Sequence, residues 1–184
     1  DSLTVKDFTL SLGVKQFLVD LERGDRFGDT TTIKANSDSD VLFSGGLMWE
    51  TSIEGLEAFV GYSENFKAIS DVLLEDSEID LSTIEPETST NTEIGLRYTA
   101  GKIVASATYF ENDFENRLIL VSVSSPAGID YLGTGTGFYE NSGGIDSSGL
   151  ELALDYALTD QFSLYTAYTY NDSTYLGTGN TALD

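Results

Sequence analysis

A strict two-residue alternation of apolar with polar or small side chains, late in the sequence, limits the folds open to this chain. Leu or Tyr occupies every second position of residues 150–158, and Glu, Asp or Ala stands between them. After the short segment 159–161, a similar alternation occupies residues 162–170. Successive side chains of a β-strand point to opposite faces of its sheet. The two runs therefore predict two strands, each with one mainly apolar face, joined by a tight turn.

The length of these runs favours strands that cross a membrane. Each run is about ten residues long, whereas soluble strands average roughly 5–6 residues and a tilted membrane strand needs roughly 9–11. No stretch of the sequence approaches the roughly 18 apolar residues of a membrane-spanning helix. That is expected for a barrel, because only every second residue of a membrane strand faces lipid. The two strands thus resemble one hairpin of a transmembrane barrel.

The composition excludes most catalytic chemistry. The 184 residues include no Cys and no His, which rules out disulfides, thiolate or imidazole metal sites and Ser-His-Asp catalysis. Thirty-one acidic and nine basic residues give a net charge of −22, which repels the phosphates of nucleic acids. We therefore expect a protein that is not an enzyme, with no catalytic residue, no cofactor, no metal site and no nucleic-acid partner.

Further strands are expected along the rest of the chain, in residues 5–23, 41–50, 55–66, 91–99 and 102–123. The first of these runs past the length that a bilayer requires, and the last loses its phase beyond Phe110. The short connections are 51–54, 100–101 and 159–161, and the long ones are 24–40, 67–89, 124–144 and the segment from 171. Long and short connections alternate, as they do in outer-membrane barrels with long extracellular loops and short periplasmic turns.

These observations predict an all-β fold, a section of an antiparallel transmembrane β-barrel with about seven strands. Bacterial single-chain barrels close with an even number of strands, and open edges in lipid leave backbone groups unpaired. The seven strands should therefore belong to a larger barrel.

Three segments resemble the barrel domain of TonB-dependent outer-membrane receptors. Segment 44–68 is similar to the family's strand, short turn and strand, although Ile69 stands near the place of the family's usual proline. Segment 84–119 matches a second motif at Pro86, Glu87, Asn91, Glu93, Gly95 and Arg97, and its second strand ends in Asp-Phe-x-Asn. Segment 139–154 matches a third at Asn141, Gly143, Gly149, Leu150 and Glu151. Together the motifs cover about residues 38–170 in the family's order.

The resemblance implies active uptake of a scarce nutrient, most often a ferric siderophore, across the outer membrane of a Gram-negative cell. It implies contacts with outer-membrane lipid and lipopolysaccharide, and energy supplied by the TonB complex. Residues 1–184 would form part of one barrel domain, without the family's plug domain, through which TonB acts, and without its terminal strand.

Two groups of residues are candidates for function. One group, on the polar face of the strands, would point into the lumen of a barrel, to contact the plug or a solute or to form an ordinary interior network: Glu57, Glu93, Arg97, Glu151 and Asp155. The other group, Tyr131, Phe138 and Tyr139, lies in a long loop and could stack on a siderophore or sugar, or simply pack the loop.

Other interpretations of the sequence remain open. Acidic residues such as Asp76, Glu78 and Asp80 could bind calcium, but the calcium-loop signature is not matched, and solvated loop charge is the expected role. A passive porin or an adhesin-like barrel would share the strand pattern. A soluble β-sandwich binding module would instead bury Leu150, Leu152 and Leu154 in a core.

Overall fold

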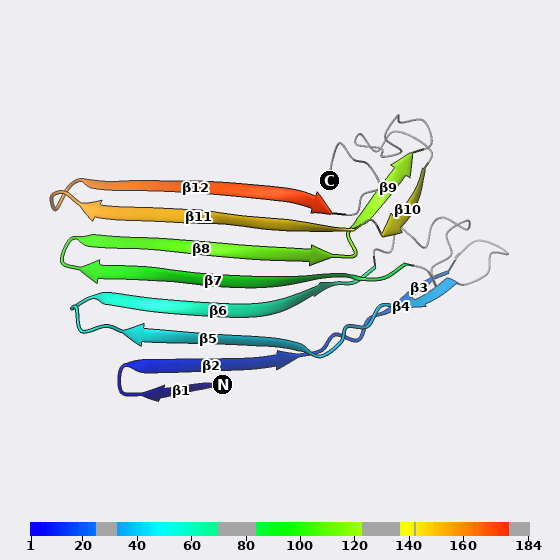
Figure 1. The fold of residues 1–184 in the computed structure, drawn as a ribbon, viewed down its shortest axis with the longest axis horizontal. Coiled ribbons are helices and arrows are strands. Elements are labelled where there is room, and N and C mark those ends of the chain that lie inside the picture. The colour runs from blue at the N-terminus through cyan, green and yellow to red at the C-terminus, as the bar shows by residue number, and fades with distance from the viewer. Residues whose placement is uncertain (25–32, 70–83, 123–136, 142, 177–184) are drawn as a thin grey trace.

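The computed structural model describes residues 1–24, 33–69, 84–122, 137–141 and 143–176, and their regular structure is entirely β (Figure 1). Eight strands form one antiparallel sheet, in the order β1-β2-β5-β6-β7-β8-β11-β12. Each strand pairs with the next strand of the sheet along the chain. Their bounds are β1 Ser2–Val5, β2 Phe8–Lys15, β5 Leu42–Glu50, β6 Leu56–Lys67, β7 Glu87–Ala100, β8 Ile103–Glu115, β11 Gly144–Ala157 and β12 Ser163–Leu176.

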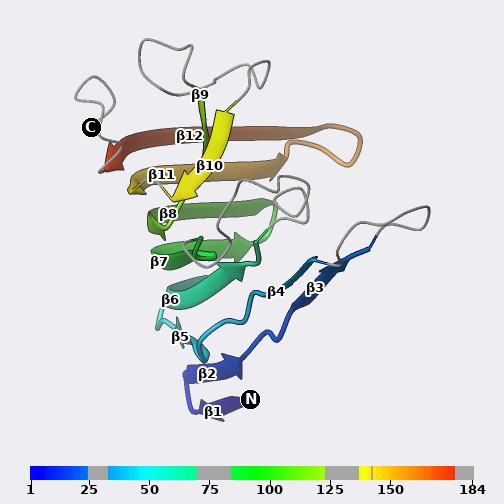
Figure 2. The same ribbon diagram turned by 90° about the vertical axis from the view of Figure 1, so that its right-hand side faces the viewer.

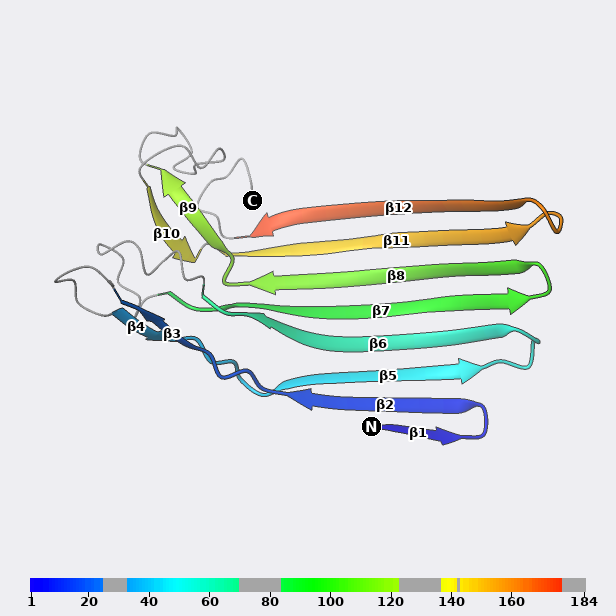
Figure 3. The ribbon, with the colours of Figure 1, turned by 180° about the vertical axis from the view of Figure 1, so that it is seen from behind.

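Two short hairpins continue from one end of the main sheet. Strand β3 (Asp20–Arg23) pairs with β4 (Ile33–Asn36), and β9 (Leu118–Ser122) pairs with β10 (Gly137–Asn141). Both hairpins lie at the same end of the sheet, which Figures 1 and 3 show from opposite sides. The strands of the main sheet are joined by short turns at the other end, so the predicted sorting of long and short connections is confirmed.

The turn between β5 and β6 depends on a glycine. Gly55 has a φ of +79°, and a Cβ atom there would lie 2.2 Å from the carbonyl oxygen of Thr99 in β7. The carbonyl oxygen of Gly55 in turn accepts a hydrogen bond of 2.8 Å from the Thr99 amide. A side chain at this position would be strained by its backbone and would clash with β7.

The structure divides two predicted strands. Residues 5–23 contain a turn at Lys6 and Asp7, where Lys6 has a φ of +54° and Val5 pairs with Phe8. Residues 102–123 divide into β8 and β9 at Asn116, whose φ is +55°. The main sheet consequently has eight strands where about seven were predicted, and further short strands lie in the long connections.

The sheet is a single layer (Figure 2). One of its two faces is apolar. One row of paired residues crosses all eight strands on this face, and every side chain in it is at least 37% exposed. The row consists of Leu3, Leu10, Leu47, Val60, Ile94, Tyr109, Leu150 and Tyr170. The apolar face predicted for residues 150–158 and 162–170 is confirmed, and it continues across the other strands of the sheet.

Buried apolar residues are few and lie away from this face. Among the described residues, the buried apolar side chains are Leu42, Ile69 and Ile84, near the end with the long connections. A β-sandwich would seal Leu150, Leu152 and Leu154 between two sheets, but Leu150 and Leu152 are exposed and Leu154 is partly exposed. The sandwich interpretation is therefore wrong. The described residues contain no helix with the length and apolar character needed to cross a bilayer.

Candidate functional site

The apolar face ends at tyrosines that are followed by acidic residues. The Tyr62 hydroxyl donates a hydrogen bond of 2.8 Å to Glu64, and the Tyr109 hydroxyl donates one of 3.0 Å to Glu111. Each carboxylate lies two residues beyond its tyrosine, on the same face and toward the long connections. Amphipathic tyrosines favour a membrane interface, whereas charges are costly at the centre of a bilayer. The two tyrosine–carboxylate pairs therefore fit the boundary of a lipid-facing surface, at the end with the long connections.

The opposite face carries the five residues that were predicted to face the lumen. Glu57 of β6 lies directly across from Arg97 of β7 in the sheet register. Glu93 lies four residues before Arg97 on the same face of β7, and Glu151 and Asp155 are on β11, beyond β8. Within the described residues, no ion pair joins Arg97 to any of these acids at 4.0 Å or less. The structure places all five on one face but brings only Glu57 and Arg97 opposite each other.

Two aromatic rings on this face cover glycines of neighbouring strands. A Cβ atom on Gly95 would lie 2.5 Å from the Phe59 ring, and one on Gly149 would lie 2.6 Å from the Phe110 ring. The Arg97 guanidinium then lies over the Phe59 ring, 4.5 Å from its centre. A ring laid over a glycine covers exposed backbone and fixes the strand pairing. Gly95 and Arg97 thus acquire a shared structural role through Phe59.

Small residues leave a hollow of about 750 Å³ on the polar face beside the Phe59 ring. Its floor includes Ser11, Gly13, Gly46 and Gly61 from β2, β5 and β6. Glu93, Arg97 and Phe59 also line it, so the hollow presents an acidic and a basic side chain beside an aromatic ring. A body resting on this face could form both apolar and charge-assisted contacts here.

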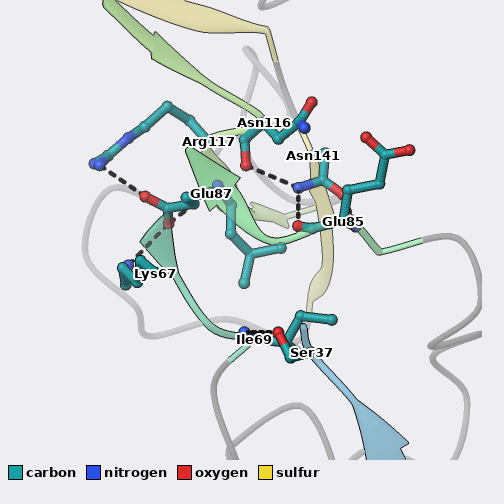
Figure 4. Close-up of polar contacts among 9 residues, drawn as sticks. Ser37, Lys67, Ile69, Glu85, Glu87, Asn116, Arg117 and Asn141 are labelled. Atoms are coloured by element: carbon teal, nitrogen blue, oxygen red, sulfur yellow. Dashed lines mark hydrogen bonds and ion pairs between the residues drawn. The ribbon is translucent and has the colours of Figure 1, made fainter. Parts of the chain in front are cut away.

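A cluster of polar contacts joins the bases of the long connections, and we call it the rim clasp (Figure 4). It consists of Ser37, Lys67, Ile69, Glu85, Glu87, Asn116, Arg117 and Asn141. Glu87, only 7% exposed, accepts charge-assisted hydrogen bonds of 2.8 Å from Lys67 and 2.9 Å from Arg117. A buried carboxylate is stable when its charge is paired in this way.

Asn141 is the second centre of the rim clasp. Its side-chain oxygen accepts a hydrogen bond of 2.7 Å from the Glu85 amide, and its side-chain nitrogen donates to the carbonyl oxygens of Glu85 and Asn116 at 2.9 and 2.8 Å. The family resemblance pointed to Glu87 and Asn141 but gave them no role. It gave no indication of their partners Lys67 and Arg117, because these contacts depend on the tertiary fold.

The predicted ligand-contacting aromatics lie only partly within the described structure. Tyr131 is outside the described residues, as are Asp76, Glu78 and Asp80. Phe138 and Tyr139 lie on β10, where they pair with Val121 and Leu120 of β9, and only their backbone is described. In the described part of the chain, no group of three Asp or Glu residues is arranged to hold a metal ion.

Known proteins share the sequence pattern and the fold of this chain. The family model "TonB dependent receptor-like, beta-barrel" matches residues 1–183. The iron-regulated outer membrane virulence protein of Vibrio cholerae serotype O1 (El Tor Inaba N16961) is 32% identical over 94 residues. Those residues make up 49% of this chain but only 14% of that protein, so the match spans about a seventh of the relative.

Solved structures similar to the chain include an iron transporter, a copper transporter and an outer membrane receptor. The FrpB iron transporter from Neisseria meningitidis (F3-3 variant) has a TM-score of 0.64 and 20% identity, over 95% of this chain and 24% of that one. The copper transporter OprC has a TM-score of 0.70 and 15% identity, over 95% of this chain and 27% of that one. The pyoverdine outer membrane receptor FpvA from Pseudomonas aeruginosa PAO1, bound to pyoverdine, has a TM-score of 0.65 and 21% identity. The match covers 93% of this chain and 23% of that one. Because the three identities are this low, the comparison with these structures shows a shared fold alone.

Proposed function

Because this chain belongs to the family of TonB-dependent receptor β-barrels of the Gram-negative outer membrane, we propose that the intact protein takes up a ferric siderophore with energy supplied by TonB. The observation that carries the proposal is the division of one single-layer sheet into an apolar face and a polar face. An outer-membrane barrel needs such a wall, with lipid on one side and a polar interior on the other.

The choice of iron as cargo is supported by the comparisons. The similar protein of Vibrio cholerae is described as iron-regulated, and two of the similar structures are described as an iron transporter and a pyoverdine receptor. The copper transporter has the same fold, which shows that the fold alone does not select the cargo. We therefore assign selection of the ligand to the long connections, with Tyr131, Phe138 and Tyr139 as contacts that stack on it.

The polar face is proposed to meet the domain that fills the barrel. Glu57, Glu93, Arg97, Glu151 and Asp155 would contact this plug or the passing solute, and the plug would transmit the action of TonB. Outer-membrane lipid and lipopolysaccharide would cover the apolar face. Members of the family are transport receptors, so no enzymatic step forms part of this proposal.

A growth experiment tests the proposal. A strain that lacks the gene is grown under iron limitation with a panel of ferric siderophores, each supplied as the only iron source. We expect growth to fail with a subset of them, and expect the complemented strain to lose growth on the same subset when tonB is inactivated. Growth of the deletion strain equal to that of the wild type on every siderophore would contradict the proposal that the cargo is a ferric siderophore. Uptake that continues without TonB would favour the passive porin.

A further inference from the structure

The two long connections on either side of the β7-β8 pair are tied together at their bases. One connection runs from Lys67 to Glu87, between β6 and β7, and the other runs from Asn116 to Gly143, between β8 and β11. The four ends of these connections meet in the rim clasp (Figure 4). The contacts of Glu87 with Arg117 and of Asn141 with Glu85 join one connection to the other. The contacts of Lys67 with Glu87 and of Asn116 with Asn141 join the two ends of a single connection.

Asn141 links three of these ends through one side chain. It holds Glu85, 56 positions earlier in the sequence, through both the amide and the carbonyl of that residue, and it holds the Asn116 carbonyl, 25 positions earlier. An asparagine side chain has one acceptor oxygen and two donor hydrogens, and all three functions are used here. Neither a carboxylate nor an aliphatic side chain could replace it.

Glu87 provides a second link that is separate from the first. One of its carboxylate oxygens binds Lys67 at the start of the first connection, and the other binds Arg117 at the start of the second. Backbone contacts support this arrangement, because the Arg117 amide donates to the Gly143 carbonyl at 3.2 Å. The Ile69 amide also donates to the Ser37 hydroxyl at 2.8 Å, which adds the connection between β2 and β5.

Apolar packing supports the same region. Ile69 and Ile84, at the two ends of the first connection, form a buried pair against which Leu21 of β3 and Leu118 of β9 pack. These four side chains come from all three long connections. Polar and apolar contacts thus join the same segments, so that a displacement of one base disturbs the contacts of the others.

We propose that the rim clasp couples the bases of the connections between β6 and β7 and between β8 and β11, so that they move as one unit. Asn141 and Glu87 are its positioning residues. A ligand that displaces one connection would then displace the other without touching it. The coupling lies outside the proposed transport cycle and does not depend on the identity of the ligand, so it can be tested without one.

Hydrogen–deuterium exchange of the intact receptor in detergent measures the coupling directly, because the amides of Ile69, Glu85 and Arg117 all donate across the rim clasp. We expect Asn141→Ala to raise exchange roughly tenfold at residues 84–87 and 116–118, since a net hydrogen bond contributes about the free energy of such a change. A rise confined to residues 137–143 would overturn the proposal.

Glu87→Gln provides the test of transmission. The substitution removes the charge that holds Lys67 and Arg117 but leaves the three hydrogen bonds of Asn141 in place. If the connections move as a unit, exchange should also rise at residues 137–141, which Glu87 does not contact through any of these bonds. No change there would count against the coupling.

Two further variants separate hydrogen bonding from folding. Asn141→Asp has almost the same shape but lacks both donors, so we expect it to raise exchange at residues 116–118 as Asn141→Ala does. Exchange like that of the wild type would show that packing alone holds the segments, and would overturn the proposal. Asn171→Ala is the matched control, because among the described residues the Asn171 side chain bonds to Ser147 and Ser173, within the β11-β12 pair. It should leave residues 84–87 unchanged.

Discussion

At the scale of single residues, the polar face depends on glycines, whose missing side chains leave room for aromatic rings. The Phe59 ring occupies the space that a side chain on Gly95 would need, and the Arg97 guanidinium lies over the same ring. A cation over an aromatic face is stabilised by about 0.5–1 kcal/mol at exposed sites. The motif residues Gly95 and Arg97 are therefore joined through a third residue, which lies on another strand.

Gly95→Val should destabilise the barrel by roughly 1–3 kcal/mol, because overpacking forces neighbouring groups to shift. The new Cβ atom would lie 2.5 Å from the Phe59 ring and 2.7 Å from the Ala107 carbonyl oxygen, and the backbone group cannot turn away. Urea unfolding of the folded receptor measures the change. Gly46→Ala, where the nearest atom is 3.6 Å away, is the control and should cost much less. Equal losses would show that the ring and the carbonyl do not restrict Gly95.

At the scale of elements, β11 shows how one strand separates two surroundings. Leu150 and Leu152 lie on the apolar face, and Glu151 and Ala153 lie on the polar face, where they pair with Thr169 and Ala167 of β12. Adjacent residues of one strand should therefore respond to the same substitution in opposite ways.

Leu152→Arg should cost roughly 2–4 kcal/mol, because it places a charge on the lipid-facing side near the middle of the membrane. Ala153→Arg, one residue away on the polar face, should be tolerated. The two variants can be compared by the yield of folded receptor in the outer membrane and by unfolding in urea. Similar losses for both would argue against the assignment of the faces.

The sequence was sufficient to predict the faces of the strands but not all of their limits. Alternation identified the apolar positions of β11 and β12 because that signal is local. The turn at Lys6 and Asp7 was missed, because two adjacent polar residues between Val5 and Phe8 do not interrupt an apolar pattern strongly. The contacts of Asn141 were beyond prediction for a different reason: they join residues 56 and 25 positions apart, and no periodic pattern specifies such pairs.

At the scale of the whole molecule, the sorting of connections gives the wall a direction. The short turns lie at one end of the sheet, and the hairpins β3-β4 and β9-β10 and the rim clasp lie at the other (Figure 3). Outer-membrane barrels place their longer loops outside the cell. The rim clasp should therefore be exposed to the surroundings of the bacterium.

Single cysteines test this orientation, because residues 1–184 contain none of their own. Lys34→Cys, on β4, should react with a maleimide that cannot cross membranes when it is added to intact cells. Ile53→Cys, in the exposed turn between β5 and β6, should react only after the outer membrane is opened. Labelling of the turn and not of β4 in intact cells would reverse the proposed direction.

The wall is a single sheet, so the sequences of its two faces can diverge independently during evolution. Each side chain of the sheet faces either the lipid or the interior of the barrel, so selection acts on it from one of these surroundings. Substitutions among Leu, Ile, Val and Phe on the outer surface can accumulate without altering what passes through. A new cargo can in turn be acquired without new adaptation to the bilayer, which suits a scaffold that serves different nutrients.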